Sequence, residues 1–93
     1  MDEIEFEWDE IKNLKNLEKH GVDFFVAQLV FDDPYRIVAH DDRHSATEER
    51  LFCIGNVNGK ILTVRFVKRG NIIRIIGAGE WRKWKKIYVD QHH

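Results

Sequence analysis

The chain contains one cysteine, one proline and no long hydrophobic run. The single Cys53 excludes an internal disulfide and a zinc site built from several cysteines. No stretch approaches the roughly 18 apolar residues that a membrane-spanning helix needs. Residues 2–10 carry six acidic side chains and no basic one, unlike the basic start of a signal peptide. These absences predict a cytoplasmic protein.

Length and composition predict one globular domain over residues 1–93. The chain is 43% hydrophobic, which suffices for one small core and excludes two-domain enzymes. The closing His92 and His93 resemble the remains of a purification tag and are left out of every candidate site.

The charge is nearly balanced in total but not along the chain. Residues 1–49 carry 14 acidic and 5 basic side chains, whereas residues 50–93 carry 10 basic and 2 acidic ones. One interpretation is that the two halves neutralise each other across the fold. The other is a basic working face built from the second half, which can bind phosphate by releasing counterions.

The first third of the chain predicts a strand and two helices. Residues 4–8 alternate apolar and acidic side chains, as a strand with one solvated face does. Asp9 is a suitable N-cap for a helix that ends at Gly21. One side of this helix is apolar and the opposite side is basic; the apolar side consists of Ile11, Leu14 and Leu17.

A second helix is expected to begin at Asp23 and to end at Asp32-Asp33-Pro34. Its residues are apolar nearly all round, so it is expected to be heavily buried.

The second half predicts an antiparallel meander and a last helix. Asn58-Gly59 is a strong hairpin signal, because both positions of a type I′ turn need positive φ. The helix is expected from about Trp81. The strands are expected over residues 35–40, 50–57, 60–68 and 72–76. The order β-α-α-β-β-β-β-α predicts an α+β fold, with two N-terminal helices and a C-terminal helix packed on an antiparallel sheet.

Arg74 is the first candidate site residue, because it interrupts the apolar run Ile72–Ile76. Burying a guanidinium without a partner is expensive. Arg74 therefore either pairs with one of the early acids or points from a concave sheet towards a phosphate. Its planar fork matches carboxylate and phosphate alike.

Two further positions suit acid–base work. Glu49-Arg50, near Arg43 and His44, could supply a base and a charge stabiliser, or could simply be a solvated strand start. Histidine is the side chain type whose charge changes near neutral pH, which suits His20 to proton transfer, although its place at a helix end is explained by the helix dipole alone.

The segment from His40 to His44 has two histidines with carboxylates between them. A metal site built from His40, Asp42 and His44 is one reading, but the spacing matches no established zinc signature. We expect no metal and no cofactor.

The run Trp81–Lys86 interleaves aromatic and basic residues, which suits base stacking with backbone contact. At helical spacing, Trp81 and Trp84 equally suit the core, with lysines at the rim. Cys53, beside Phe52 and Ile54, is expected to be a small core residue.

Four motifs together resemble a known family, the BrnT toxins of type II toxin–antitoxin systems. The resemblance covers nearly the whole chain, most clearly residues 4–78. The motifs are Phe6-Glu7-Trp8-Asp9 with Lys12 and Asn16; Lys19-His20-Gly21-Val22 with Phe24, Ala27, Phe31 and Asp33; Arg43 with Glu49-Arg50 and Gly55; and Arg74-Ile75-Ile76 with Ala78.

The resemblance implies a RelE-like fold and metal-independent RNA cleavage. It also implies a BrnA-like ribbon-helix-helix antitoxin as partner, with DNA bound only indirectly through that antitoxin. One position departs from the family pattern: Gly79 stands where better-known members have an arginine, and Glu80 follows it. If that arginine carries transition-state charge, this chain is a weaker nuclease or none.

The expected reaction is attack of the RNA 2′-hydroxyl on the adjacent phosphorus, with positioned proton transfers and cationic charge stabilisation. The candidate catalytic residues are His20, Glu49, Arg50 and Arg74, and the candidate RNA-binding residues are Lys12, Lys19, Arg65 and Lys83. Two rival classes stay open. One is a toxin-like module that binds its partner without cleaving RNA, and the other is a metal-dependent hydrolase.

Overall fold

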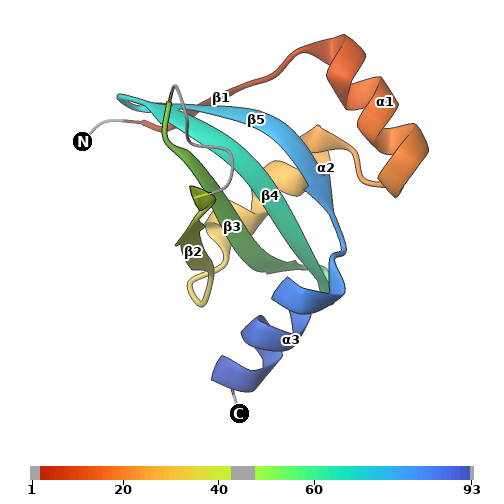
Figure 1. Ribbon diagram of the computed structural model, residues 1–93, viewed down its shortest axis with the longest axis vertical. Helices are drawn as coiled ribbons and strands as arrows, with labels where there is room; N and C mark the ends of the chain where they lie inside the picture. The colour runs from red at the N-terminus through yellow and green to blue at the C-terminus, as the bar shows by residue number, and fades with distance from the viewer. Residues whose placement is uncertain (1–2, 43–47, 93) are drawn as a thin grey trace.

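The computed structural model describes residues 3–42 and 48–92 (Figure 1). Within these residues the sheet has five strands in the order β1-β5-β4-β3-β2, and the predicted order of elements is confirmed. The strands are β1 (Glu5–Glu7), β2 (Ile37–His40), β3 (Arg50–Val57), β4 (Lys60–Arg69) and β5 (Ile72–Gly79). The helices are α1 (Glu10–His20), α2 (Phe24–Ala27), the 3₁₀-helix η1 (Gln28–Asp32) and α3 (Arg82–Gln91).

The sheet is mixed, so the prediction of a wholly antiparallel sheet is wrong at one edge. Strands β2 to β5 are antiparallel neighbours, but β1 pairs with β5 in parallel, from Glu5 opposite Ile72 to Glu7 opposite Arg74. Hairpins fix the direction of the later strands. No hairpin joins β1 to β5, because most of the chain lies between them, and such a long connection allows parallel pairing.

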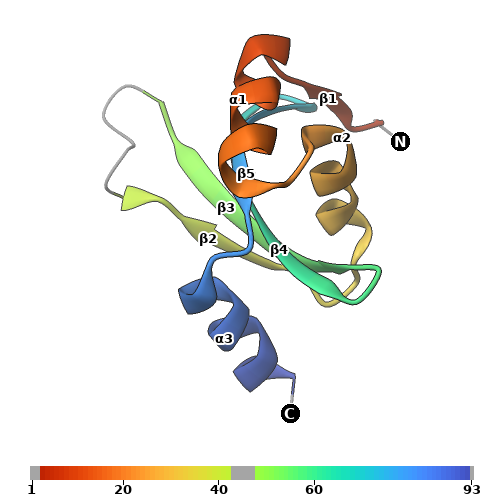
Figure 2. The same cartoon turned by 90° about the vertical axis from the view of Figure 1, so that its right-hand side faces the viewer.

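Strand β1 pairs only with the first part of β5, and helix α1 lies beside the edge of β5 further along that strand (Figure 2). The side-chain amide of Asn16 donates to the Ala78 carbonyl at 3.0 Å, and its oxygen accepts from the Ala78 N–H at 3.2 Å. The same amide donates to the Val22 carbonyl at 2.9 Å. Asn16 thus satisfies backbone groups that a neighbouring strand would otherwise pair, and it fixes α1 against the sheet.

The predicted caps and hairpin turn are confirmed. The carboxylate of Asp9 accepts from the Ile11 N–H, and Gly21 ends α1 at φ 71° with its N–H donated to the Leu17 carbonyl. Asn58 and Gly59 have φ of 53° and 91°, as the predicted hairpin turn requires.

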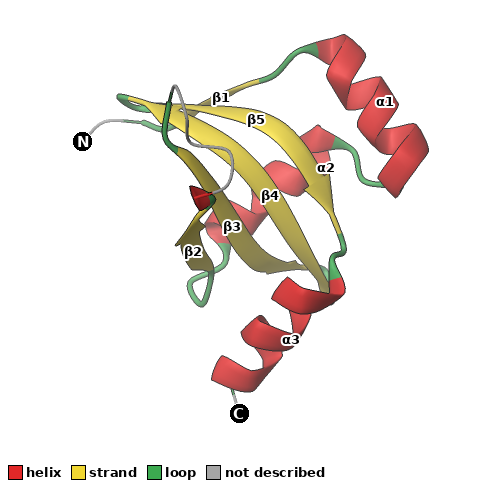
Figure 3. Ribbon diagram, viewed as in Figure 1, coloured by secondary structure: helices red, strands yellow, loops and turns green. Residues whose placement is uncertain are grey.

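The two faces of the sheet carry different helices (Figures 1 and 3). Helices α2 and η1 cover the main core, which includes Phe24, Val30, Val64 and Ile75. Gly55 lets η1 come close, because a Cβ there would lie 2.8 Å from the Val30 carbonyl oxygen. Helix α3 covers part of the opposite face with a smaller cluster built from Ile54, Ile61 and Tyr88.

The apolar side of α1 does not face the core. Ile11 and Leu14 are 64% and 58% exposed, whereas the polar Asn13 is only 5% exposed. Asn13 accepts from the Phe24 N–H at 2.8 Å and donates to the Asp23 carboxylate. At a sheet edge and a helix start the groups that need partners are backbone amides and carbonyls, so asparagines point inwards instead of leucines.

The second helix is also less buried than predicted. It is an α-turn followed by a 3₁₀-helix, and the side chain of Phe25 is 66% exposed. Phe24, Ala27 and Val30 face the core, but Phe25, Val26 and Leu29 face outwards. One side of so short a helix touches the sheet, so the other side stays in solvent.

In the part of the chain described, no helix has the length and apolar character needed to cross a membrane.

Candidate functional site

A cavity of about 240 Å³ lies between α1, the middle of the sheet and the start of α3. We call it the α1–β5 cavity. Its described lining contains four cationic side chains, one histidine and no carboxylate. The lining residues are Lys12, Lys15, Asn16, Lys19, His20, Arg65, Ile76, Gly77 and Trp81. Such a set of cations favours an anionic ligand.

Three of these cations come from one side of α1. Lys12, Lys15 and Lys19 recur at spacings of three and four residues, so they share a face of the helix. Within residues 3–42 and 48–92, none of them has a carboxylate within ion-pair distance. The hydrogen bonds of Asn16 to Ala78 hold this face beside β5.

His20 occupies the last turn of α1, directly after Lys19 in the sequence. Its ring lies edge-on to the indole of Trp81, with centroids 5.5 Å apart and planes at 75°. Gly21 then turns the chain away in a left-handed conformation. The imidazole therefore lines a cavity whose charged side chains, among the described residues, are all cations.

Arg65 is the cation that the sheet contributes. It lies on β4 opposite Phe52 of β3 and Gly77 of β5, and its Cδ would be 3.7 Å from a Cβ at Gly77. Its Nη2 is 3.5 Å from the buried Asp41 carboxylate. Its Nε is buried and has no hydrogen-bond partner among the described residues. The guanidinium is incompletely satisfied, which is unusual for a buried donor and suits a group that receives a ligand.

A second and larger cavity of about 670 Å³ adjoins the first. It shares Arg65 and Trp81 with the α1–β5 cavity, and we call it the indole cavity. Trp84 packs on Phe52 with centroids 5.0 Å apart, and Lys83 Nζ lies 5.1 Å above the Trp84 ring. Its lining residues are His40, Asp41, Asp42, Phe52, Arg65, Trp81, Lys83 and Trp84.

The indole of Trp81 lies over Gly79. A Cβ at Gly79 would lie 2.9 Å from Cε2 and 3.0 Å from Cζ2 of the indole. Contacts that short do not occur, so any larger residue at 79 displaces the ring. The glycine and the tryptophan are therefore a matched pair.

The structure brings four predicted site residues together in one cavity: Lys12, Lys19, His20 and Arg65. Lys83 lies in the adjoining indole cavity. Lys15 was missed as a site residue, and Trp81 was considered only as part of the aromatic and basic run Trp81–Lys86, with the core as its alternative place. The Lys12-Lys15-Lys19 spacing was a signal for the first, but nothing in the sequence showed that Trp81 would turn back over Gly79.

Arg74 lies elsewhere and has a partner. Its Nη1 is 2.7 Å from a carboxylate oxygen of Glu7, the residue opposite it on β1. Of the two alternatives for Arg74, the ion pair with an early acid is the one present. Arg50 lies in the same row across the sheet, opposite Val67, which in turn is opposite Arg74.

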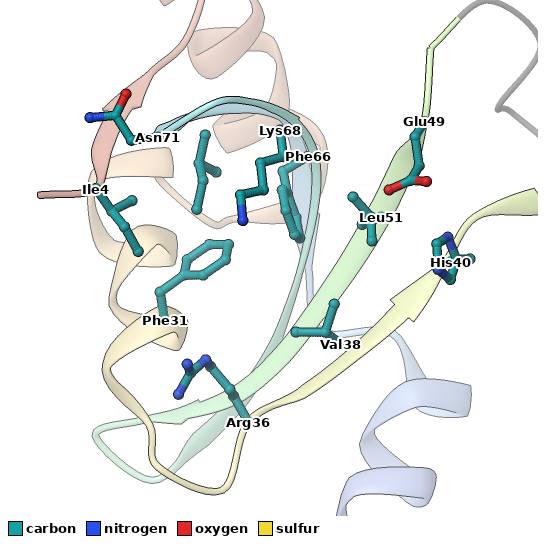
Figure 4. Close-up of a pocket in the computed structure, with 11 residues that line it drawn as sticks. Ile4, Phe31, Arg36, Val38, His40, Glu49, Leu51, Phe66, Lys68 and Asn71 are labelled. Carbon is teal, nitrogen blue, oxygen red and sulfur yellow. The ribbon is translucent and has the colours of Figure 1, made fainter. Parts of the chain in front are cut away.

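Glu49 lines a different cavity, of about 370 Å³, on the face of the sheet that carries the main core (Figure 4). Arg36, Leu51 and Lys68 also line this cavity. The structure therefore does not bring Glu49 to His20. Arg43 and His44 lie outside the described residues, and the described ones contain no group of three or more potential metal ligands.

Asp33 and Tyr88 have shifted pKa values and lie outside the α1–β5 and indole cavities. Asp33 accepts from the Tyr88 hydroxyl at 2.5 Å and from the N–H groups of Asn56 and Tyr35. Burial raises the pKa of Asp33, but these three hydrogen bonds outweigh it and leave the pKa below 3.8. Burial and the bond to Asp33 raise the pKa of Tyr88 to about 12. This pair joins α3 to the end of η1.

Cys53 is a core residue, as predicted. Its side chain is fully buried, and burial raises the pKa of its thiol to about 12. It is therefore protonated at neutral pH and unsuited to nucleophilic chemistry.

Comparison with known families identifies the class. The family described as "Ribonuclease toxin, BrnT, of type II toxin-antitoxin system" matches residues 8–84. The chain belongs to the BrnT family, and the resemblance drawn from the four motifs is confirmed. Membership makes it a ribonuclease toxin of a type II toxin–antitoxin system, with RNA as target and an antitoxin as partner. A search of curated proteins gave no match.

Proposed function

We propose that this protein is a metal-independent endoribonuclease that cleaves RNA in the α1–β5 cavity. The observation that carries the proposal is the lining of that cavity, where Lys12, Lys19 and Arg65 surround His20 with no carboxylate among the lining residues. A cationic cavity holds the RNA backbone, and a histidine supplies the proton transfer that the reaction needs.

The proposed reaction uses the RNA's own nucleophile. Neutral His20 takes the proton of the 2′-hydroxyl, and O2′ attacks the adjacent phosphorus. The bond from phosphorus to O5′ breaks, and O5′ takes a proton from water. The products are a 2′,3′-cyclic phosphate and a 5′-hydroxyl. Lys12, Lys19 and Arg65 bind the phosphoryl oxygens as negative charge develops on them.

The test is a pair of oligonucleotides that differ in one oxygen. An RNA that the protein cleaves at one bond is compared with the same RNA carrying a 2′-deoxy sugar at that position, both in excess EDTA. The proposal expects cleavage of the first, with a 2′,3′-cyclic phosphate end, and none of the second. A 5′-phosphate product, or cleavage that stops in EDTA, would refute this mechanism.

We also propose a RelE-like fold, a cytoplasmic location and a ribbon-helix-helix antitoxin. The order of elements, β-α-α-β-β-β-β-α, supports the fold. The exposed apolar residues of α1 and α2 support a protein partner that binds these two helices, because solvent-exposed apolar groups can mark interaction surfaces. Ile11, Leu14 and Phe25 are exposed there, beside the acidic Glu10 and Glu18. An amphipathic antitoxin segment with basic residues along its rim matches this face.

Binding of the purified antitoxin tests this surface. Leu14→Glu and Phe25→Glu are expected to weaken binding at least about tenfold, because each places a charge in an apolar contact. Val38→Glu is the matched control, since Val38 is also exposed but lies on β2. Equal effects of all three variants would place the antitoxin elsewhere.

A second candidate function rests on Gly79. Residue 79 is a glycine, so it contributes no side chain and no positive charge to the α1–β5 cavity. If an arginine at this position is essential for cleavage, the protein is a toxin-like module that binds its antitoxin without cutting RNA. The same oligonucleotide experiment separates the two candidates.

A further inference from the structure

We propose that the indole cavity binds a nucleobase of the RNA whose phosphate occupies the α1–β5 cavity. This inference rests on the proposed ribonuclease function and assigns the part of the substrate that the second cavity takes. Three observations carry it: the aromatic walls, the different charge patterns of the two cavities and the two residues that they share.

The walls of the indole cavity suit a flat aromatic ligand. Trp81 and Trp84 both line it, and Phe52 supports Trp84 from the sheet at a centroid distance of 5.0 Å. A volume of about 670 Å³ is within the usual range for a small-molecule site. Every base has a π-face, so stacking on an indole binds nucleotides without demanding one sequence.

The charge patterns assign the base to one cavity and the phosphate to the other. The α1–β5 cavity has cations and no carboxylate in its lining, whereas Asp41 and Asp42 line the indole cavity. Carboxylates repel a phosphate, and the exposed Asp42 can accept hydrogen bonds from the amino and imino groups of a base edge, whereas Asp41 is buried against Arg65. Lys83, whose Nζ lies 5.1 Å above the Trp84 ring, also lines this cavity and adds a cation that can pair with the sugar–phosphate chain.

Arg65 and Trp81 form the wall between the two cavities. The Arg65 guanidinium has a buried Nε without a partner among the described residues and only a 3.5 Å contact from Nη2 to Asp41. Trp81 is fixed between Gly79 and the ring of His20. A nucleotide that lies across this wall places its phosphate beside His20 and its base beside the indole.

The experiment measures binding without cleavage. The probe is a fluorescein-labelled 2′-O-methyl trinucleotide, which lacks a free 2′-hydroxyl, and the comparison is the same trinucleotide with an abasic central position. Dissociation constants are measured by anisotropy in EDTA for the intact protein, for Trp81→Ala and for Trp81→Phe. Circular dichroism confirms that each variant is folded.

The intact protein is expected to bind the probe about 10- to 100-fold more tightly than the abasic form, the size of one base–aromatic stack. Trp81→Ala is expected to abolish that difference, and Trp81→Phe to restore most of it. The inference is overturned if the intact protein does not distinguish the two probes, if it binds neither, or if Trp81→Ala weakens both equally.

This result is separable from the proposed cleavage. A base-dependent difference that needs Trp81, in a protein that cuts no RNA, supports the base site and contradicts the ribonuclease proposal. Cleavage of RNA without any base-dependent difference in binding supports the ribonuclease proposal and contradicts the base site.

Discussion

The indole of Trp81 lies over Gly79, so close that a Cβ on residue 79 would be 2.9 Å from Cε2 of the ring. The same ring borders both cavities and meets His20 edge-on. The absence of a side chain at position 79 therefore lets the Trp81 ring lie against β5, where it lines both cavities.

The first prediction concerns this pair. Gly79→Ala is expected to lower the free energy of unfolding by about 1–3 kcal/mol, because the new methyl group must push the ring aside. Replacing Trp81 with alanine in the same protein is expected to remove most of that penalty. Urea denaturation of the two single variants and the double variant measures the coupling.

Gly77→Ala is the matched control, since a Cβ there would make an ordinary contact of 3.7 Å with Arg65. It is expected to change stability less than Gly79→Ala. If the two alanine variants lose equal stability, or if the double variant shows no recovery, the close approach of Trp81 is not what requires glycine at 79.

The second prediction concerns the ion pair of Arg74 with Glu7. The two side chains are 34% and 41% exposed, so solvent weakens their attraction, and a double-mutant cycle is expected to give about 0.2–1 kcal/mol. Arg74→Ala is also expected to retain RNA cleavage, because Arg74 lines neither cavity of the proposed site. Loss of cleavage in a folded Arg74→Ala protein would contradict this prediction and would support Arg74 as a catalytic residue.

The third prediction concerns pH and the Asp33–Tyr88 hydrogen bond. The pKa of Asp33 is lowered below 3.8, so its contribution to stability is complete above that pH and is lost as the pH falls through the folded-state value. The pKa of Tyr88 is raised from 10.0 to about 12, so its contribution is complete below pH 10 and is lost as the pH rises towards 12.

Tyr88→Phe removes this bond and is expected to cost about 1.5–3 kcal/mol at pH 7, as for a hydrogen bond to a charged group. It is also expected to move the acid-unfolding midpoint to higher pH, because the pKa of Asp33 rises when one donor is lost. Unfolding curves from pH 2 to 12 measure both effects. Identical pH profiles for the two proteins would contradict this account.

Much of the fold was predictable, because its signals are local. Alternation predicted the first strand, Asp9 and Gly21 predicted the ends of α1, and Asn58-Gly59 predicted the hairpin. The parallel pairing of β1 with β5 was not predictable in the same way. It depends on a contact between distant parts of the chain that no turn specifies.

The site was partly predictable for the same reason. Helical spacing placed Lys12 and Lys19 on one face, and strand alternation separated Arg65 from the main core. The inward direction of Asn16 was not predictable, because an amphipathic helix usually turns its leucines towards the core. Here Asn16 faces β5 and bonds to Ala78, whereas Leu14 and Leu17 are exposed. Only the assembled edge of β5 shows that backbone groups there need a polar partner.

The most direct test of the central claim is RNA cleavage in excess EDTA by the intact protein and by His20→Ala, Arg65→Ala and Arg74→Ala. A positioned proton transfer is typically worth about 10²–10⁴-fold in rate, so His20→Ala is expected to lose at least about 100-fold. Arg65→Ala is expected to lose a comparable factor, because it removes a cation from the developing charge. Arg74→Ala is expected to cleave at nearly the rate of the intact protein. Cleavage unchanged by His20→Ala and Arg65→Ala, in folded proteins, would contradict the assignment of the α1–β5 cavity as the active site.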